Sequence, residues 1–142
     1  MSTTRVTSLK GEEIVFRNEV SASGGMKDIH FHPDRKYVVG FFRDVSDQKA
    51  LRDRLSDITT RYRENLLDQP SGPFWEKHFC WPFDVVEHNG KIGVVAPFYD
   101  KAFFFEHGSN NGDKFKIKGR DKEGKWFVGS LRDRHLDPRE KG

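Results

Sequence analysis

The chain has 142 residues, of which 35% are hydrophobic and 33% are charged, and its formal net charge is +3. This length is sufficient for one domain with a hydrophobic core. Lys and Arg alternate with Asp and Glu along the chain, so no nucleic-acid partner is expected. No apolar run is long enough to span a bilayer, so no membrane association is expected. Cys80 is the only cysteine, which excludes an intrachain disulfide and is typical of a cytoplasmic protein.

Residues 1–11 are polar and are expected to be flexible. The domain is expected to occupy residues 12–138, followed by a short tail at 139–142. In the first part of the domain, β-branched and aromatic residues predict three strands, which are expected at 13–20, 28–32 and 37–43. A loop of small residues at 21–27 and a turn that contains Pro33 are expected to separate these strands.

A single amphipathic helix is expected after the third strand. Asp44 or Ser46 is expected to cap its first turn. Apolar residues recur every three or four positions and form one stripe, which consists of Leu51, Leu55, Ile58, Tyr62 and Leu66. The helix is expected to end before the segment 68–73, because this segment contains two prolines and a glycine. A short helical turn is expected within the aromatic segment 74–82.

The most regular pattern lies at 83–99 and predicts two strands joined by a tight turn. Asn89 and Gly90 suit a type I′ turn, in which both central residues need a positive φ. The residues at 92–96 are almost wholly apolar, as in a strand that is buried on both faces, and Pro97 ends the strand. A buried strand that leads into a short connector is a suitable place for a ligand, although a core hairpin without a site fits the same pattern.

Beyond residue 100 the sequence is rich in aromatic residues. A short strand is expected at 115–118, whereas residues 131–142 are charged and show no core pattern.

The order of three strands, one helix and a two-stranded hairpin resembles the N-terminal lobe of eukaryotic-like protein kinases. The segments 79–82 (FCWP), 86–97 (VEHNGKIGVVAP) and 124–127 (GKWF) resemble a bacterial subfamily, the serine/threonine-kinase-like proteins found beside tellurite-resistance-type genes, often with a helix-hairpin-helix tail. The resemblance implies an α+β fold with a twisted antiparallel sheet of about five strands and one long αC-like helix. It also implies ATP and Mg as cofactors of the whole kinase.

The resemblance assigns the phosphate-covering loop to residues 21–27. Glycines at Gly24 and Gly25 and small side chains at Ser21 and Ser23 would let the backbone approach a phosphate closely. A plain β-turn is the alternative interpretation of this loop.

The kinase lysine on the third strand would fall on Gly40, Phe41 or Phe42, none of which can hold a phosphate. Lys27 on the second strand is therefore expected to replace it, and Arg43 is the other nearby cation. An exposed surface lysine is the alternative interpretation of Lys27. The acidic helix residue that pairs with the kinase lysine has three candidates: Asp53, Asp57 and Glu64.

The resemblance places the connector between the two kinase lobes at 96–99. The backbone around Ala96 and Phe98 would bind an adenine there, and Val39 and Val20 would pack on the faces of the ring. On the sequence alone these two valines are simply core residues. His30 and His32 lie on one face of a strand but lack a third ligand, so no metal site is expected.

No catalytic loop of the type HRDxxxxN and no DFG motif is found in the sequence. The chain is therefore expected to be an N-terminal lobe that is part of a longer protein, with a C-terminal lobe supplying the catalytic residues. The expected partners are a nucleotide and that second lobe. Five aromatic side chains that follow the connector would lie against the second lobe in a complete kinase; without that lobe they are expected to be partly exposed and to support self-association: Phe103, Phe104, Phe105, Trp126 and Phe127. The alternative function is a non-catalytic α+β module that binds another protein, or a pseudokinase fragment.

Overall fold

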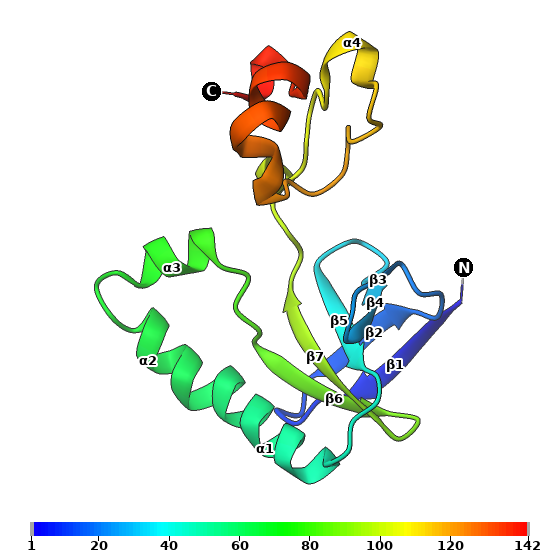
Figure 1. The fold of residues 1–142 in the computed structure, drawn as a ribbon. Helices are drawn as coiled ribbons and strands as arrows, with labels where there is room; N and C mark the ends of the chain where they lie inside the picture. The colour runs from blue at the N-terminus through cyan, green and yellow to red at the C-terminus, as the bar shows by residue number, and fades with distance from the viewer. Residues whose placement is uncertain (1, 142) are drawn as a thin grey trace. The chain divides into compact units, whose positions relative to one another are not determined.

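The structure, a computed structural model, describes residues 2–141, which form two compact units, Met1–Phe98 (unit 1) and Tyr99–Gly142 (unit 2) (Figure 1). The division between the units falls directly after the predicted hairpin, within the single domain expected at 12–138. None of the helices formed by residues 2–141 combines the length and the apolar character needed to cross a lipid bilayer.

Unit 1 combines β-sheets with helices. Its elements are β1 (Thr3–Thr7), β2 (Glu13–Arg17), β3 (Ala22–Ser23), β4 (Lys27–Phe31), β5 (Tyr37–Phe42), α1 (Gln48–Asp57), η1 (Ile58–Tyr62), α2 (Arg63–Leu67), α3 (Gly72–His78), β6 (Asp84–His88) and β7 (Lys91–Pro97). Five strands form an antiparallel sheet in the order β3-β4-β5-β7-β6, and β1 pairs with β2 in a second sheet. The expected α+β class and five-stranded antiparallel sheet are confirmed.

The hairpin formed by β6 and β7 has the predicted turn. Asn89 and Gly90 have φ angles of 51° and 73°, as a type I′ turn requires. β7 lies between β5 and β6, and its residues Ile92, Val94 and Val95 are buried. The prediction of a strand buried on both faces is therefore confirmed.

The predicted helix extends over α1, η1 and α2, but its N-cap differs from the prediction. The carboxylate of Asp47 accepts a hydrogen bond from the backbone N–H of Ala50 at 3.0 Å. Asp44 has a φ of 52°, so the chain is still turning at this residue. The cap was wrong because several adjacent polar residues suit an N-cap equally, and only the path of the chain selects one of them.

The apolar stripe of this helix is interrupted by the π-helical turn η1. Tyr62 is 49% exposed, whereas Thr59, which was not expected in the core, is 2% exposed. A π turn contains one more residue than an α turn, so the buried side shifts along the sequence. Two backbone carbonyl groups of this turn accept hydrogen bonds from side chains outside the helix. The indole N–H of Trp81 donates to Ile58 O and the ammonium of Lys10 donates to Thr59 O, each at 2.8 Å.

The five-stranded sheet is covered on both sides. On one side, which we call the helix-side face, Leu55 of α1 packs against Val85, Ile92 and Val94. On the other side, the N-terminal face, the buried residues are Ile14 and Phe16 of β2 together with Val39, Phe41, Val86 and Val95. Because side chains alternate along a strand, each strand contributes one set of residues to each face.

The N-terminal segment differs from the prediction. The segment 1–11, expected to be flexible, contains β1, which pairs with β2 from Thr3 opposite Arg17 to Thr7 opposite Glu13. The polar sequence of β1 gave no strand signal, because only Val6 provides a large apolar side chain. The strand forms because β2, whose Ile14 and Phe16 are in the core, offers it a free edge.

Unit 2 consists of turns and short helical segments around its own core. Its elements are η2 (Lys101–Phe103), α4 (Asn110–Asp113), η3 (Gly124–Phe127), η4 (Leu131–His135) and η5 (Pro138–Glu140). The core contains Phe105, Ile117, Trp126 and Leu136. Phe105 and Trp126, which were expected to be partly exposed, are thus buried. Residues 115–118 do not form the expected strand, and the segment 131–141 contributes Leu136 to the core.

The loop at 107–119 in unit 2 is organised by the carboxylate of Asp113. The carboxylate accepts hydrogen bonds from the N–H and the hydroxyl of Ser109 and from the N–H groups of Ile117 and Lys118, all at 3.0 Å. The donors lower the pKa of Asp113 to about 2, with the Ser109 N–H contributing most. The charged carboxylate thus acts as the centre of the loop.

Acid is expected to open this loop. The pKa of Asp113 is about 2 in the folded chain, below the ordinary value of 3.8 for an aspartate. Its stabilising contribution is therefore complete above pH 3.8 and is lost as the pH falls towards 2. We expect the NMR amide signals of Ile117 and Lys118 to move towards random-coil positions in that range.

The variant Asp113→Asn should weaken the loop at pH 6 and reduce its pH dependence, because the amide group cannot accept at both of its terminal atoms. Asp137, whose pKa is also about 2, would account for the pH dependence that remains. The control variant is Asp121→Asn, since Asp121 is exposed. If Asp113→Asn and wild type show the same pH profile, Asp113 does not hold the loop.

Candidate functional site

The loop of small residues at 21–27 is the turn of a hairpin between β3 and β4. The N–H of Gly24 donates to Lys27 O at 3.0 Å. Ideal Cβ atoms placed on Gly24 or Gly25 meet no atom within 4 Å, so the outside of the turn is open. Ser21 lies before β3, where its hydroxyl accepts from the N–H of Phe31 at 3.3 Å.

Arg43 holds this turn from one side. Its guanidinium donates to the carbonyl of Gly24 and to the hydroxyl of Ser23, and it forms an ion pair with Asp28. The Ser23 hydroxyl and the Arg43 guanidinium hold the pKa of Asp28 below its ordinary value. Arg43 is therefore occupied by the turn.

The two cations expected at the site lie on opposite faces of the sheet. Lys27 is paired with Phe42, whereas Asp28, the partner of Arg43, is paired with Phe41 of the N-terminal face. Because neighbouring side chains point to opposite faces, Lys27 belongs to the helix-side face and Arg43 to the N-terminal face. The register of β4 and β5 thus separates Lys27 from Arg43, the other nearby cation expected at the site.

Lys27 lies across the sheet next to Gly40. A Cβ on Gly40 would lie 3.1 Å from Cδ of Lys27 and 3.0 Å from Cδ1 of Ile29, so the glycine leaves room for both side chains. The ammonium of Lys27 is 5.3 Å from the centre of the Phe42 ring, within the range of a cation–π contact. Among residues 2–141, Lys27 forms no ion pair.

None of the helix carboxylates expected beside Lys27 pairs with it. Asp53 pairs with Lys49 at 2.9 Å and Asp57 with Arg61 at 3.6 Å, while Glu64 is exposed. These pairs lie along the solvent side of the helix. The ammonium of Lys27 therefore has no protein carboxylate within the described chain.

Ala96 and Phe98 lie on the same face as Lys27. Ala96 is paired with Val38, and Val38 is two residues before Gly40 on β5. Residues two apart on a strand point to the same face, so Ala96 shares the face of Gly40 and Lys27. The ring of Phe98 contacts that of Phe31 with 4.8 Å between centroids. Within residues 2–141 the backbone N–H of Phe98, directly after β7, has no hydrogen-bond acceptor. A donor is thus available at the connector.

Neither of the two valines expected beside the base belongs to the strand residues of this face. Val39 is fully buried in the N-terminal face, and Val20 is 52% exposed outside the strands. Val38 is the valine that faces the same side as Lys27. The register places Val39 on the opposite face, which the sequence could not show, because a one-residue change of register exchanges the two faces of a strand.

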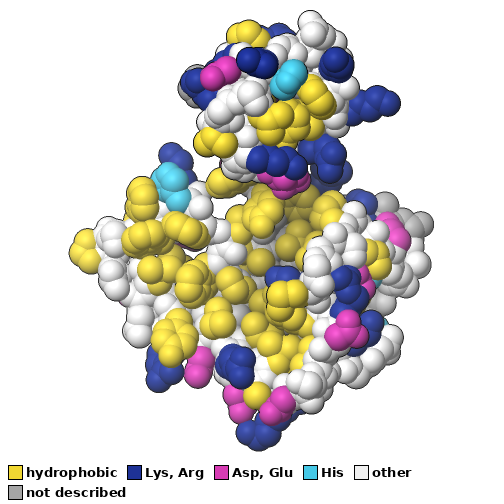
Figure 2. All heavy atoms as spheres, in the orientation of Figure 1, with side chains coloured by type: hydrophobic (Ala, Val, Ile, Leu, Met, Phe, Trp, Pro, Cys, Tyr) yellow, Lys and Arg dark blue, Asp and Glu magenta, His cyan; other side chains and the backbone are white. Residues whose placement is uncertain are grey.

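The helix-side face is only partly covered. Leu55 of α1 packs over β6 and β7, whereas the residues around Lys27 on β3, β4, β5 and the connector are partly exposed. We call this region the open patch; it consists of Ala22, Lys27, Ile29, Phe31, Val38, Ala96 and Phe98. Figure 2 shows hydrophobic side chains gathered around a hollow on the face of unit 1 that it draws.

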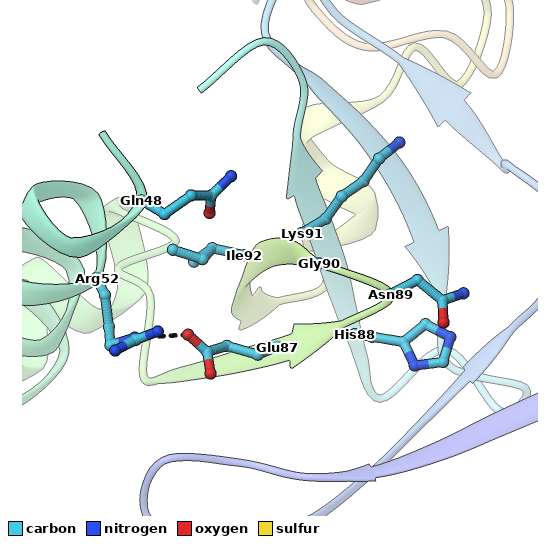
Figure 3. A pocket seen from close by; sticks show the side chains of 8 residues that line it. All are labelled: Gln48, Arg52, Glu87, His88, Asn89, Gly90, Lys91 and Ile92. Atoms are coloured by element: carbon cyan, nitrogen blue, oxygen red, sulfur yellow. Dashed lines mark hydrogen bonds and ion pairs between the residues drawn. The ribbon is translucent and has the colours of Figure 1, made fainter. Parts of the chain in front are cut away.

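A separate hollow of about 350 Å³ lies between the start of α1 and the turn after β6 (Figure 3). It is lined by polar groups that include Gln48, Lys91 and the ion pair between Arg52 Nε and Glu87 Oε1, at 2.5 Å. No residue expected from the sequence to bind a ligand lines this hollow. Arg52 already has a carboxylate partner, whereas Lys91 is exposed and forms no ion pair among residues 2–141.

The two histidines weighed as metal ligands both bind backbone groups. His30 Nδ1 lies 2.8 Å from Arg17 O, and His32 Nδ1 accepts from the N–H of Asp34 at 2.9 Å. In the part of the chain that the structure describes, no three His, Cys, Asp or Glu side chains lie close enough together to hold a metal ion.

Comparison with known proteins gives no family assignment. No protein-family model, curated protein or solved structure matches the chain. The geometry of unit 1 and the sequence motifs are therefore the observations that bear on function.

Proposed function

We propose that unit 1 binds an adenine nucleotide on the open patch, as the N-terminal lobe of a bacterial serine/threonine-kinase-like protein. The observation that carries the proposal is the position of Lys27. Its ammonium lacks a carboxylate partner and lies beside Gly40, one of the positions at which the kinase lysine was expected. A lysine relocated from β5 to β4 would thus reach the same side of the sheet.

The other groups of the open patch fit the parts of a nucleotide. Val38 and Ala96 offer an apolar surface to the base, and the unpaired N–H of Phe98 offers a donor to the edge of an adenine. Gly24 and Gly25 leave the outside of the β3–β4 turn free for phosphate oxygens. Arg43 supports this turn from the opposite face and makes no contact with the nucleotide.

Phosphoryl transfer needs further groups. A catalytic base and the ligands of Mg²⁺ would come from a second lobe, because the sequence contains neither an HRDxxxxN nor a DFG motif. We therefore propose that this chain contributes nucleotide binding, and that transfer to Ser or Thr requires the second lobe.

An ATP acyl phosphate can test the position of Lys27. In this reagent the lysine Nζ attacks the acyl carbon, the bond between that carbon and the phosphate oxygen breaks, an amide forms, and ATP leaves as the proton passes to solvent. We expect mass spectrometry to find the acyl group on Lys27, and excess ATP to reduce this labelling at least tenfold.

Lys36 is the internal control, because it is exposed and forms no ion pair among residues 2–141. Its labelling should be weak and insensitive to ATP. The variant Arg43→Gln should loosen the turn and lower the protection of Lys27 by ATP, whereas Lys36→Gln should leave this protection unchanged.

Lys27 labelling that excess ATP does not reduce would overturn the proposal and favour a protein-binding module. The exposed rings of Phe74 and Phe79 would be available to such a module.

A further inference from the structure

The charge of the chain is divided unevenly between the two units. Unit 1 contains 14 Lys and Arg and 14 Asp and Glu, whereas unit 2 contains 11 Lys and Arg and 8 Asp and Glu. The whole net charge of +3 therefore belongs to the 44 residues of unit 2. The composition of the whole chain, from which no nucleic-acid partner was expected, conceals this difference.

Four cations of unit 2 lie together in one loop. Lys114, Lys116, Lys118 and Arg120 are exposed, and none of them forms an ion pair among the described residues. We call these four residues the basic loop. Between them Ile117 is buried, so the backbone of the loop is anchored in the core of unit 2.

The acidic residues near the basic loop do not neutralise it. The carboxylate of Asp113 accepts four hydrogen bonds inside the loop and forms no ion pair with a lysine among the described residues. Four other carboxylates have basic partners elsewhere, since Glu123, Asp133, Asp137 and Glu140 pair with Lys125, Arg132, Arg139 and Lys122. Asp121 is the one acidic residue directly beside the loop without such a partner among residues 99–141.

An aromatic ring lies within the basic loop. Phe115 is 41% exposed, and its ring meets those of Trp126 and His135 edge-on, with centroids 5.6 and 5.0 Å away. The two neighbouring rings fix its orientation, so one part of the ring is held at the surface, and in the sequence Phe115 stands between the exposed Lys114 and Lys116. A fixed aromatic surface among unpaired cations combines a stacking partner for a base with charges for the phosphates.

We propose that the basic loop and Phe115 form a binding site for single-stranded nucleic acid. The four cations bind phosphates without sequence preference, and Phe115 stacks on one base. An acidic protein would use the charges but would have no use for the stacking surface. This inference concerns unit 2 and is independent of nucleotide binding by unit 1.

The test is fluorescence anisotropy with a labelled 20-nucleotide oligo(dT) and the whole chain, between 50 and 200 mM salt. If all four cations bind phosphates, log K should fall with log salt with a slope of about −2.8, and the double variant Lys114→Gln/Lys118→Gln should reduce this slope to about −1.4. Phe115→Leu should weaken binding at least about fivefold with an unchanged slope. The charge-matched control Lys36→Gln/Lys77→Gln in unit 1 should bind like wild type.

Three results would overturn the inference. One is the absence of binding at 50 mM salt. Another is an equal affinity for duplex DNA or for polyglutamate, because either would show that stacking contributes nothing. The third is an equal loss in the two double variants, which would indicate general charge attraction. Near-ultraviolet circular dichroism of Phe115→Leu checks that the Trp126 environment is preserved, and Phe115→Tyr, which keeps a ring, should retain binding.

Discussion

Phe16→Ala is expected to lower the free energy of unfolding of unit 1 by about 3–5 kcal/mol. Phe16 is 3% exposed, and its ring meets the rings of Phe41 and His30 edge-on, with centroids 5.3 and 5.5 Å away. The loss would combine the transfer free energy of the ring with the cost of a cavity between the two sheets of unit 1. Urea unfolding monitored by circular dichroism at 218 nm measures it.

Phe74→Ala provides the matched control, since the same atoms are removed from a ring that is 53% exposed. Phe74 stacks on His78 with 4.2 Å between centroids, so a cost of about 1 kcal/mol is expected. If Phe16→Ala costs no more than Phe74→Ala, the sheet of β1 and β2 does not pack on the five-stranded sheet. The same result would agree with the flexible N-terminal segment that the polar sequence of residues 1–11 predicted.

Gly72→Ala is expected to destabilise unit 1 by about 3 kcal/mol, the upper end of the usual cost of overpacking. Gly72 is buried where α3 begins, and its Cβ would lie 1.9 Å from Leu67 O and 2.8 Å from Leu67 C. Both atoms are backbone at the end of α2, so no side-chain rotation can relieve the clash. The turn at 68–71 would have to open, which moves α3 away from α2.

Gly25→Ala is the control for this variant. A Cβ at Gly25 meets nothing within 4 Å, so the expected change lies between zero and a gain of about 1 kcal/mol from the stiffer unfolded chain. Unfolding followed by the fluorescence of Trp75 and Trp81, which lie in and after α3, compares the two variants. Equal stability of Gly72→Ala and wild type would mean that the turn between α2 and α3 is looser than the structure describes.

Local features of the sequence were sufficient for part of the fold. Asn89-Gly90 between two apolar segments predicted the β6–β7 hairpin, because the turn and both strands are adjacent in the chain. The breakers at 68–73 predicted the end of the helix at Leu67, because proline and glycine act on their own backbone. Lys27 was predicted as the replacement cation, and the structure places it beside Gly40 on the partly exposed side of the sheet.

Other features depend on contacts between segments that are distant in the sequence, so no local sequence pattern predicts them. β1 is a strand only because β2 presents an edge to it. The π turn at 58–62 moved Thr59 into the core in place of Tyr62. The charged segment 131–141 gained a buried Leu136 only through the core of unit 2.

In the candidate site, too, some features could be predicted from the local sequence and others depend on tertiary contacts. The residue types at 21–27, at Lys27 and at 96–98 could be selected from the sequence, since small residues, cations and a connector after a buried strand are visible there. Which of them face one another depends on the register between β4, β5 and β7. That register places Lys27 with Val38 and Ala96 and places Val39 and Arg43 on the opposite side. Side chains alternate along every strand, so pairing across the sheet, which only the tertiary structure decides, determines which residues can share a ligand.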